Sequence, residues 1–422
     1  MIGQRIRFHR KRQGLTLEQL SEGICSVSYL SKIEHGDKSS DEISRLLCER
    51  LNIEHEEMSH TEQIDQIHQE INHWYSQMIT IPNPIELNPI KESLEEKIAL
   101  IQDPCLSMKY ELMCFYYYLA LQQYDSSSQL KKKLHIFEEM FDVELQYYYN
   151  LFSGIYFSNI THLDEASECL SKAEELQNRL PHSDQNEAEL CYQIGRMECL
   201  RYQISKCIQY SSKSLSLFNQ SYNLKRIADC QILLGISHRR INNFAQSEHH
   251  FEQALKFTSI LKSDQRTSIL YDNMAYCYAG QNNHTLAIDY LTKSIEIKRK
   301  NKELAFSVTS TLTLLAEEYF RIGEFNKARE TVDETMELII PSDQSIDYLK
   351  LVVLDYQLSD PIHPDYESFL RQKVIPVLAE RNMWEEVSLY SEQLAEYYFK
   401  KHRYKLSSVY FKKANEARKN IL

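Results

Sequence analysis

A repeat of about 40 residues runs through most of this 422-residue chain and restricts its fold more than any other feature. A small or turn-like residue recurs eight times in the middle of an apolar, helix-like pattern. These residues are Cys114, Gly154, Gly195, Gly235, Ala275, Ala316, Asp355 and Ala395, with spacings of 39 to 41 residues. So steady a period is typical of stacked units that cannot bury their apolar faces alone. The sequence therefore predicts an all-α fold built mainly as a solenoid.

The side chains around these positions follow the tetratricopeptide pattern, as where Ala275 is followed by Ala287 and Leu291. Small residues let the two helices of a pair touch, and large ones fill the space between pairs. That motif is about 34 residues long, so the longer period implies longer helices or loops. We predict a right-handed array of about eight units over residues 104–422, with the first and seventh units recognised by phase more than by sequence.

The N-terminal 60 residues carry a different pattern, of short helices with caps. Residues 2–12 have helical spacing, and Thr16 with Gln19 forms a capping-box arrangement at the start of a second helix. Ser26 and Ser40 each precede a further helix. This order predicts a helix-turn-helix domain whose third helix enters the major groove of double-stranded DNA.

Candidate DNA contacts follow from that geometry, in which the N-terminal residues of the third helix face base edges and basic residues contact phosphates. One recognition helix covers only a half-site, so we expect a homodimer or a higher oligomer. The candidates are Ser26, Val27, Ser28 and Tyr29 for the base edges, and Arg5, Arg10 and Lys32 for the phosphates.

The charge distribution is compatible with DNA contact, although the net charge of −12 alone would argue against it. Residues 1–12 contain five basic residues and no acidic one, whereas residues 61–422 contain 39 basic and 50 acidic residues. A basic patch on an acidic body is compatible with local phosphate contact.

A polar helix over residues 61–78 and the proline-rich stretch IPNPIELNP (81–89) separate the two patterns. We place the boundary between residues 58 and 64. The predicted domains are 1–60, which binds DNA, 61–103, which holds a linker helix and a first helical pair, and 104–422, the repeat array.

The first helix of each unit is expected to line a concave groove that binds an extended peptide. Asn273 is the leading candidate, since one amide can donate to and accept from a peptide backbone. Each candidate could instead be solvated or bonded to the next unit. The candidates are Gln193, Arg196, Leu233, Arg239, Asp272, Asn273, Tyr276 and Glu317.

The segment TLEQLSEGICSVSYLSKIEHGDKSS resembles the lambda-repressor-like (XRE) family in T-x-E-Q-L and Y-L-S-K-I-E-x-G. It departs from that family in a turn one residue shorter and in Leu17, which replaces a polar residue beside the DNA backbone. With the repeats, the whole chain resembles the RRNPP group of peptide-pheromone regulators of Gram-positive bacteria, most of all its NprR-type members. The resemblance implies quorum sensing: a re-imported signalling oligopeptide binds the groove and changes the oligomeric state and DNA binding of the array.

A second hypothesis is a Rap-like antagonist that binds a response regulator of the sporulation phosphorelay. In hastening dephosphorylation of that regulator, it would use a glutamine of the linker helix to position the water molecule. A third hypothesis is a peptide-controlled repressor of a phage or mobile element, which shares the first mechanism and differs only in its target genes. The candidate glutamines are Gln63, Gln66, Gln69 and Gln77.

Enzyme activity is not expected, because the chain has no G-x-x-x-x-G-K-[ST], G-x-S-x-G or H-E-x-x-H motif. His249 and His250 point about 100° apart on a helix, so we do not expect them to share a metal. We expect no metal site and no cofactor in this protein. The ten cysteines form no C-x-x-C pair, and no apolar run is long enough to span a membrane. We therefore expect a cytoplasmic protein with reduced thiols.

Overall fold

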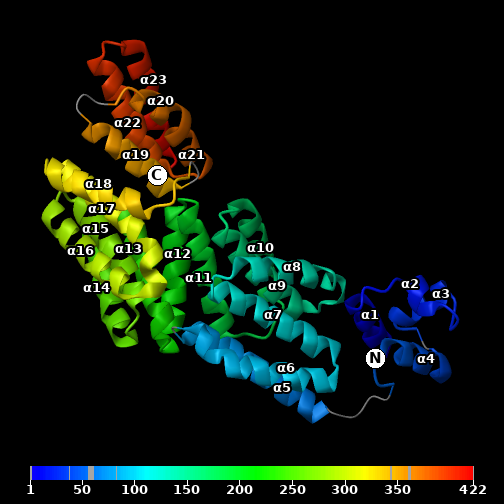
Figure 1. Cartoon of the computed structure of the whole chain (residues 1–422). Coiled ribbons are helices and arrows are strands. Elements are labelled where there is room, and N and C mark those ends of the chain that lie inside the picture. Colours follow the sequence, from blue (N-terminus) through cyan, green and yellow to red (C-terminus); the bar gives the residue numbers. More distant parts are fainter. Residues whose placement is uncertain are drawn as a thin grey trace. The chain divides into compact units, whose positions relative to one another are not determined.

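The computed structural model describes residues 2–37, 39–55, 61–81, 83–342, 345–359 and 363–421, and within these ranges it contains helices and no β-strand. The chain divides into two compact units, Met1–Ser183 and Asp184–Leu422, drawn in Figure 1. None of the helices in the described ranges is long and apolar enough to cross a membrane.

The N-terminal domain begins the first unit, and its capping pattern matches the sequence prediction. Both hydrogen bonds of the capping box between Thr16 and Gln19 are present, and Ser26 and Ser40 accept from backbone amides at their N-caps. Position 3 accepts only glycine, because the backbone of Ile33 in α3 lies where a Cβ would be. Its helices are α1 (Ile2–Arg12), α2 (Leu17–Ser21), α3 (Val27–Glu34) and α4 (Asp41–Leu51).

The rest of the first unit starts with the predicted linker helix α5 (Thr61–Thr80), whose apolar face buries Ile67, Ile71, Trp74 and Met78. The residues 56–60 at the predicted domain boundary lie outside the described ranges. The helices after α5 are η1 (Pro84–Leu87), α6 (Asn88–Ile101), α7 (Pro104–Ala120), α8 (Tyr124–His135), η2 (Glu138–Met140), α9 (Val143–Asn159) and α10 (Leu163–Gln177).

The second unit is itself a stack of helix pairs (Figure 1). The helices of its first four pairs, with one 3₁₀ turn between the third and the fourth, are α11 (Asp184–Leu200), α12 (Ile204–Gln220), α13 (Leu224–Arg240), α14 (Phe244–Leu261), α15 (Asp264–Gly280), α16 (His284–Lys300), η3 (Lys302–Ser307), α17 (Val308–Arg321) and α18 (Phe325–Leu338). The rest are α19 (Ile346–Leu358), α20 (Tyr366–Phe369), η4 (Leu370–Val374), α21 (Ile375–Glu380), α22 (Trp384–Lys400) and α23 (Tyr404–Lys419).

Each of the eight small or turn-like residues lies in the first helix of a pair, which confirms the predicted repeat. Those helices are α7, α9, α11, α13, α15, α17, α19 and α22. At Gly235 the ring of Phe251 from α14 occupies the place of a Cβ, so the two helices can touch only because this residue has no side chain. Asn242 and Asn282 take left-handed φ values of 57° and 60° in the tight turns between paired helices, and Asn382 takes one of 56° in the turn from the seventh unit to the eighth. Asn tolerates this conformation well.

The seventh unit departs from the pattern, as its weak sequence match indicated. Its second helix is divided into α20, the π-helical turn η4 and α21. Pro376 lies at the start of α21, where it cannot donate a backbone hydrogen bond to the preceding turn. Side chains from α19 to α23 then share one hydrophobic core, which includes Leu349, Leu370 and Tyr398.

Candidate functional sites

The N-terminal end of α3 presents a small, mostly exposed set of side chains. Ser26 caps the helix by accepting from the backbone N–H of Tyr29 at 3.2 Å, and its Oγ lies 3.2 Å from that of Ser28. Val27 is 40% exposed, and Lys32 is exposed one turn later. Tyr29 is half-buried and packs against the core of the N-terminal domain. This end of α3 therefore offers hydroxyl, apolar and cationic groups to a ligand.

The predicted phosphate contact of Arg10 is corrected by the structure, because this side chain is buried. Its Nε and Nη2 donate to the carboxylate of Glu34 at 2.6 and 2.7 Å, and its Nη1 donates to the carbonyl of Leu15 at 2.9 Å. Arg10 thus joins α1 to α3 and has no free face for DNA. Arg5 is half-buried and donates to the carbonyl of Glu54 at 3.1 Å.

Other basic residues of α1 contact the repeats of the first unit. Arg7 lies 2.6 Å from the carboxylate of Glu139, and Lys11 donates to the carbonyl of Ile136 at 3.0 Å. Between them, the buried rings of Phe8 and Phe137 have centroids 5.1 Å apart. The basic cluster of residues 1–12 therefore serves mostly internal contacts, which its sequence position alone did not indicate.

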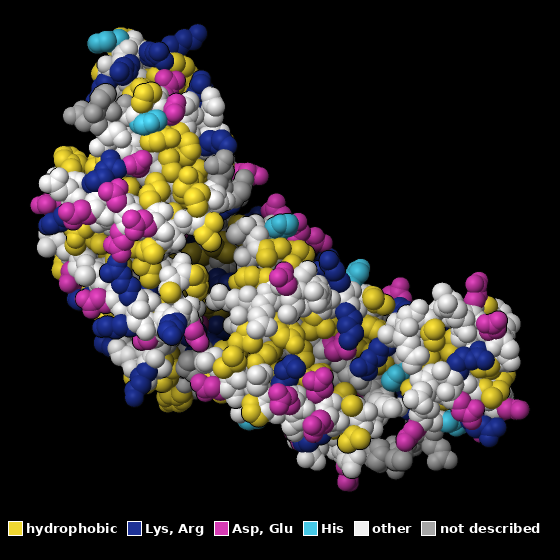
Figure 2. All heavy atoms as spheres, viewed as in Figure 1, with side chains coloured by type: hydrophobic (Ala, Val, Ile, Leu, Met, Phe, Trp, Pro, Cys, Tyr) yellow, Lys and Arg dark blue, Asp and Glu magenta, His cyan; other side chains and the backbone are white. Residues whose placement is uncertain are grey.

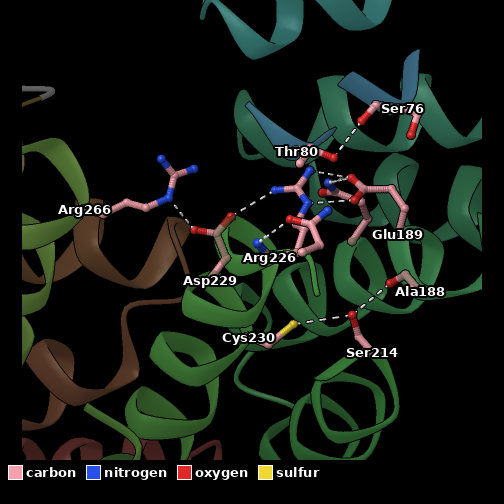
Figure 3. Close-up of polar contacts among 11 residues, drawn as sticks. Ser76, Thr80, Ala188, Glu189, Ser214, Arg226, Asp229, Cys230 and Arg266 are labelled. Atoms are coloured by element: carbon pink, nitrogen blue, oxygen red, sulfur yellow. Dashed lines mark hydrogen bonds and ion pairs between the residues drawn. The ribbon is translucent and has the colours of Figure 1, made fainter. Parts of the chain in front are cut away.

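In the second unit, a buried ionic network links α11, α13 and α15 (Figure 3). The fully buried Glu189 pairs with Arg226 at 2.6 and 2.7 Å. Arg226 also reaches Asp229 at 3.0 Å, and Arg266 donates to Asp229 at 2.8 Å. Burial raises the pKa of Asp229, but Arg266 and Arg226 together hold it below its ordinary value.

The sequence analysis missed this network, although a signal existed. Glu189 and Arg226 are 37 residues apart, and so are Asp229 and Arg266. Opposite charges at nearly the repeat period indicate ion pairs between successive units. The predicted groove residue Gln193 joins the edge of the network, since it is buried and donates to Glu189 at 2.7 Å.

Three further predicted groove residues make mainly structural contacts. Asp272 pairs with Lys298 at 2.7 Å and accepts from Thr311 at 3.2 Å, which ties three helices together. Asn273 is half-buried and donates to the carbonyl of Ile269, in its own helix, at 2.9 Å. Leu233 is buried in a cluster with Cys199 and Cys207. Arg196 on α11 is half-buried.

The remaining three predicted residues, Arg239, Tyr276 and Glu317, belong to a second charged cluster. The guanidinium of Arg239 lies 5.5 Å from the ring centroid of Tyr276. Desolvation raises the pKa of Tyr276 to about 12; nearby Lys350 acts in the opposite direction, and Glu317 reinforces the rise. Tyr276 and Glu317 also line one small pocket of about 20 Å³.

Besides Glu317, this cluster has two acidic members from α22, Glu385 and Glu386, which lie far away in the sequence. Glu385 lies 3.4 Å from Arg239 and 4.0 Å from Arg240, and Glu386 lies 3.3 Å from Lys350. Sequence analysis did not find them, because a contact across 146 residues depends on how several units curve together. On the visible face of each unit, Figure 2 shows acidic and basic side chains interspersed.

Comparisons with known proteins agree with both patterns in the chain. A helix-turn-helix family matches residues 6–58, and a tetratricopeptide repeat family matches residues 269–301. The transcriptional activator NprA of Geobacillus stearothermophilus is 30% identical over 410 residues, which cover 96% of this chain and all of NprA. The regulatory protein RapD of Bacillus subtilis (strain 168) is 25% identical, over 78% of this chain and 93% of RapD.

A solved structure supports the fold. The crystal structure of NprR in complex with its cognate peptide NprX superposes with a TM-score of 0.63 at 18% sequence identity. The match covers 83% of this chain and 99% of that one.

Proposed function

Because this chain belongs to the RRNPP family of regulators, to which its full-length similarity to NprA assigns it, we propose that it is a transcriptional regulator controlled by a short peptide. Its N-terminal domain binds DNA, and its repeat array binds a re-imported signalling oligopeptide that switches the oligomeric state. Both events take place in the cytoplasm, where the DNA is. The protein acts as a homodimer or higher oligomer, since one recognition helix covers a half-site.

One observation carries the proposal: an intact helix-turn-helix domain and a repeat array that brings Arg239, Tyr276 and Glu317 into one cluster occur in the same chain. The proposed base-edge contacts are Ser26, Val27, Ser28 and Tyr29 at the end of α3, with Lys32 and Arg5 on phosphates. Side chains on α11, α13, α15 and α17 form the proposed peptide site: Arg196, Arg239, Asn273, Tyr276 and Glu317. The assignment of 1–60, 61–103 and 104–422 as DNA-binding domain, linker and array belongs to the same proposal.

A second function is favoured by the similarity to RapD over most of the repeat array. In this alternative, the array binds a response regulator of the sporulation phosphorelay when no peptide is present. The exposed glutamines Gln63, Gln66 and Gln69 of α5 lie on the helix that would contact it. We propose no enzymatic activity, because NprA is a transcriptional activator.

The test begins with the purified protein and the peptides in conditioned medium of its own host. Peptides that remain bound are sequenced, and the native mass is measured with and without them. One retained peptide that changes the oligomeric state supports the proposal. Retention of a response regulator from lysate, with no peptide, supports the alternative.

DNA binding is tested on fragments selected from the host genome by the wild-type protein. Lys32→Gln should weaken binding about equally on all fragments, because a phosphate contact carries no sequence information. Ser28→Ala should change which fragments are preferred. Lys413→Gln, on α23, is the matched control. Equal binding by all these variants would contradict the placement of the DNA contacts on α3.

A further inference from the structure

Two helices of the second unit that are far apart in the sequence meet through opposite charges at their ends. Arg239 and Arg240 occupy the last turn of α13, and Glu385 and Glu386 occupy the first turn of α22. Basic residues are favoured at a helix C-terminus and acidic residues at an N-terminus, so each pair is stabilised by its own helix. The contact spans 146 residues and joins the fourth unit of the array to the eighth and last.

The pairing between these helices is incomplete. Both nitrogen–oxygen distances from Arg239 to Glu385 are 3.4 Å, and the distance from Arg240 Nε to Glu385 is 4.0 Å. A well-formed charge-assisted hydrogen bond measures about 2.7–2.9 Å. Near the N-terminal end of α13, the nitrogen–oxygen distances from Arg226 to Glu189 are only 2.6 and 2.7 Å. One carboxylate thus lies between two arginines without binding either closely.

Several buried polar atoms at the contact between α13 and α22 have no hydrogen-bond partner. Within the described part of the chain, Nε of Arg239 and Nε of Arg240 are buried and have no hydrogen-bond partner, and Oε2 of Glu386 is in the same state. Leaving a buried donor unpaired costs free energy, so native structures rarely keep several such atoms together. Two guanidinium groups with free donors form a site that a better-placed carboxylate can satisfy.

Aromatic rings hold both guanidinium groups in position. Arg239 lies 5.5 Å from the ring centroid of Tyr276, and Arg240 lies 4.1 Å from that of Tyr202. Their side chains are 17% and 13% exposed, whereas Glu385 is 30% exposed. The cations are therefore the fixed partners, and the glutamate is the one with access to solvent.

We propose that Arg239 and Arg240 form the carboxylate subsite of the peptide groove, and that Glu385 occupies this subsite in the free protein. The inference rests on the proposed function and specifies the chemistry of its ligand. A peptide carboxylate replaces Glu385 with a group of the same charge and shape. A phosphate dianion is disfavoured, because Glu386 and Glu317 lie in the same cluster. Displacement of Glu385 also releases α22 from α13, which couples ligand binding to the position of the last unit.

The experiment uses synthetic heptapeptide libraries without Asp or Glu, made once with a free C-terminal carboxylate and once with an amide. A third library is amidated but contains Asp and Glu. Retention by the full-length protein is measured by native mass spectrometry. We expect the free-acid library to be retained at least about tenfold better than the amide, which is about 1.4 kcal/mol. Strong retention of only the acidic amidated library would place a side-chain carboxylate in the subsite.

Variants test the same site from the protein side. Glu385→Gln removes the internal occupant and should increase retention about threefold to tenfold. Arg239→Lys with Arg240→Lys keeps the charge but loses the paired donors, so it should reduce retention about tenfold. The control is Glu392→Gln, which removes another acidic partner on α22, the one that pairs with Arg418 of α23, and should change nothing.

Two results would overturn parts of the argument separately. If the amidated, non-acidic library binds as well as the free acid and Glu385→Gln has no effect, the carboxylate subsite is wrong while peptide binding stands. If no library is retained by the wild type or by Glu385→Gln, both the subsite and the proposed peptide function fail.

Discussion

The two ionic clusters around α13 differ in how completely their charges are paired. Near its N-terminal end, Glu189, Arg226, Asp229 and Arg266 form a continuous buried network with distances of 2.6 to 3.0 Å. At its C-terminal end, Arg239 and Arg240 share Glu385 at 3.4 Å or more. The first cluster links successive units and fixes their relative positions. The second cluster links distant units. Its ion pairs are long and Glu385 is partly exposed, so a ligand carboxylate can replace Glu385 beside the two arginines.

The largest predicted effect tests the first cluster. Arg226→Met should destabilise the second unit by about 3–5 kcal/mol, because it leaves Glu189 charged and buried without its main partner. Urea unfolding followed by circular dichroism measures this change. A loss below about 1 kcal/mol would show that the network is not more important than a surface ion pair.

The matching change in the second cluster should be much smaller. Glu385→Gln is expected to alter the free energy of unfolding by less than about 1 kcal/mol, since the glutamate is partly exposed and its distances are long. The same urea experiment compares the two variants directly. If Glu385→Gln were as destabilising as Arg226→Met, the contact between α13 and α22 would be structural rather than exchangeable.

Acid should affect the first cluster through Asp229. The pKa of this carboxyl is lower in the folded protein than in the unfolded chain, where it is about 3.9. Its contribution to stability is therefore complete above about pH 5 and is lost progressively as the pH falls through the unfolded and then the folded pKa. Asp229→Asn should flatten this part of the stability curve, measured by unfolding between pH 5 and pH 2.5. An unchanged slope would mean that other carboxyls dominate.

Raising the salt concentration should have the smallest effect, and it should weaken the ion pairs of the second cluster alone. Partly exposed charges are screened at high ionic strength, and buried ones much less. Raising salt should therefore reduce the difference between wild type and Glu385→Gln in heptapeptide retention. The stability loss of Arg226→Met should stay constant in the same series. Equal salt dependence of both variants would remove the distinction between the clusters.

Local patterns made much of the fold predictable. The repeat phase located the first helix of every unit, and the caps at Thr16, Ser26 and Ser40 fixed where three helices of the N-terminal domain begin. These features depend on neighbours within a few residues, which a sequence displays directly. The seventh unit, which was recognised by phase more than by sequence, is also the one whose second helix is divided, with Pro376 at the start of α21.

The site was less predictable, because its side chains depend on distant partners. Arg10 was expected to contact a DNA phosphate, but its guanidinium instead forms a buried ion pair with Glu34 of α3. The contact of Arg239 with Glu385 requires the summed curvature of several units, and small angles between helices are not encoded in any one motif. Periodicity identifies which residues lie on the first helix of each unit, but not which of their side chains contact one another.

The interrupted second helix of the seventh unit also bears on how the protein unfolds. Side chains from α19 through α23 form a hydrophobic core of their own, with Leu370, Tyr390 and Leu394 among its buried members. In a linear array, a segment with its own core and an irregular junction forms a separate cooperative unit. Amide hydrogen exchange should therefore show residues 346–419 opening at lower free energy than α11 to α16. The C-terminal end of the array would then act as a small domain that can rearrange while the remaining repeats stay folded.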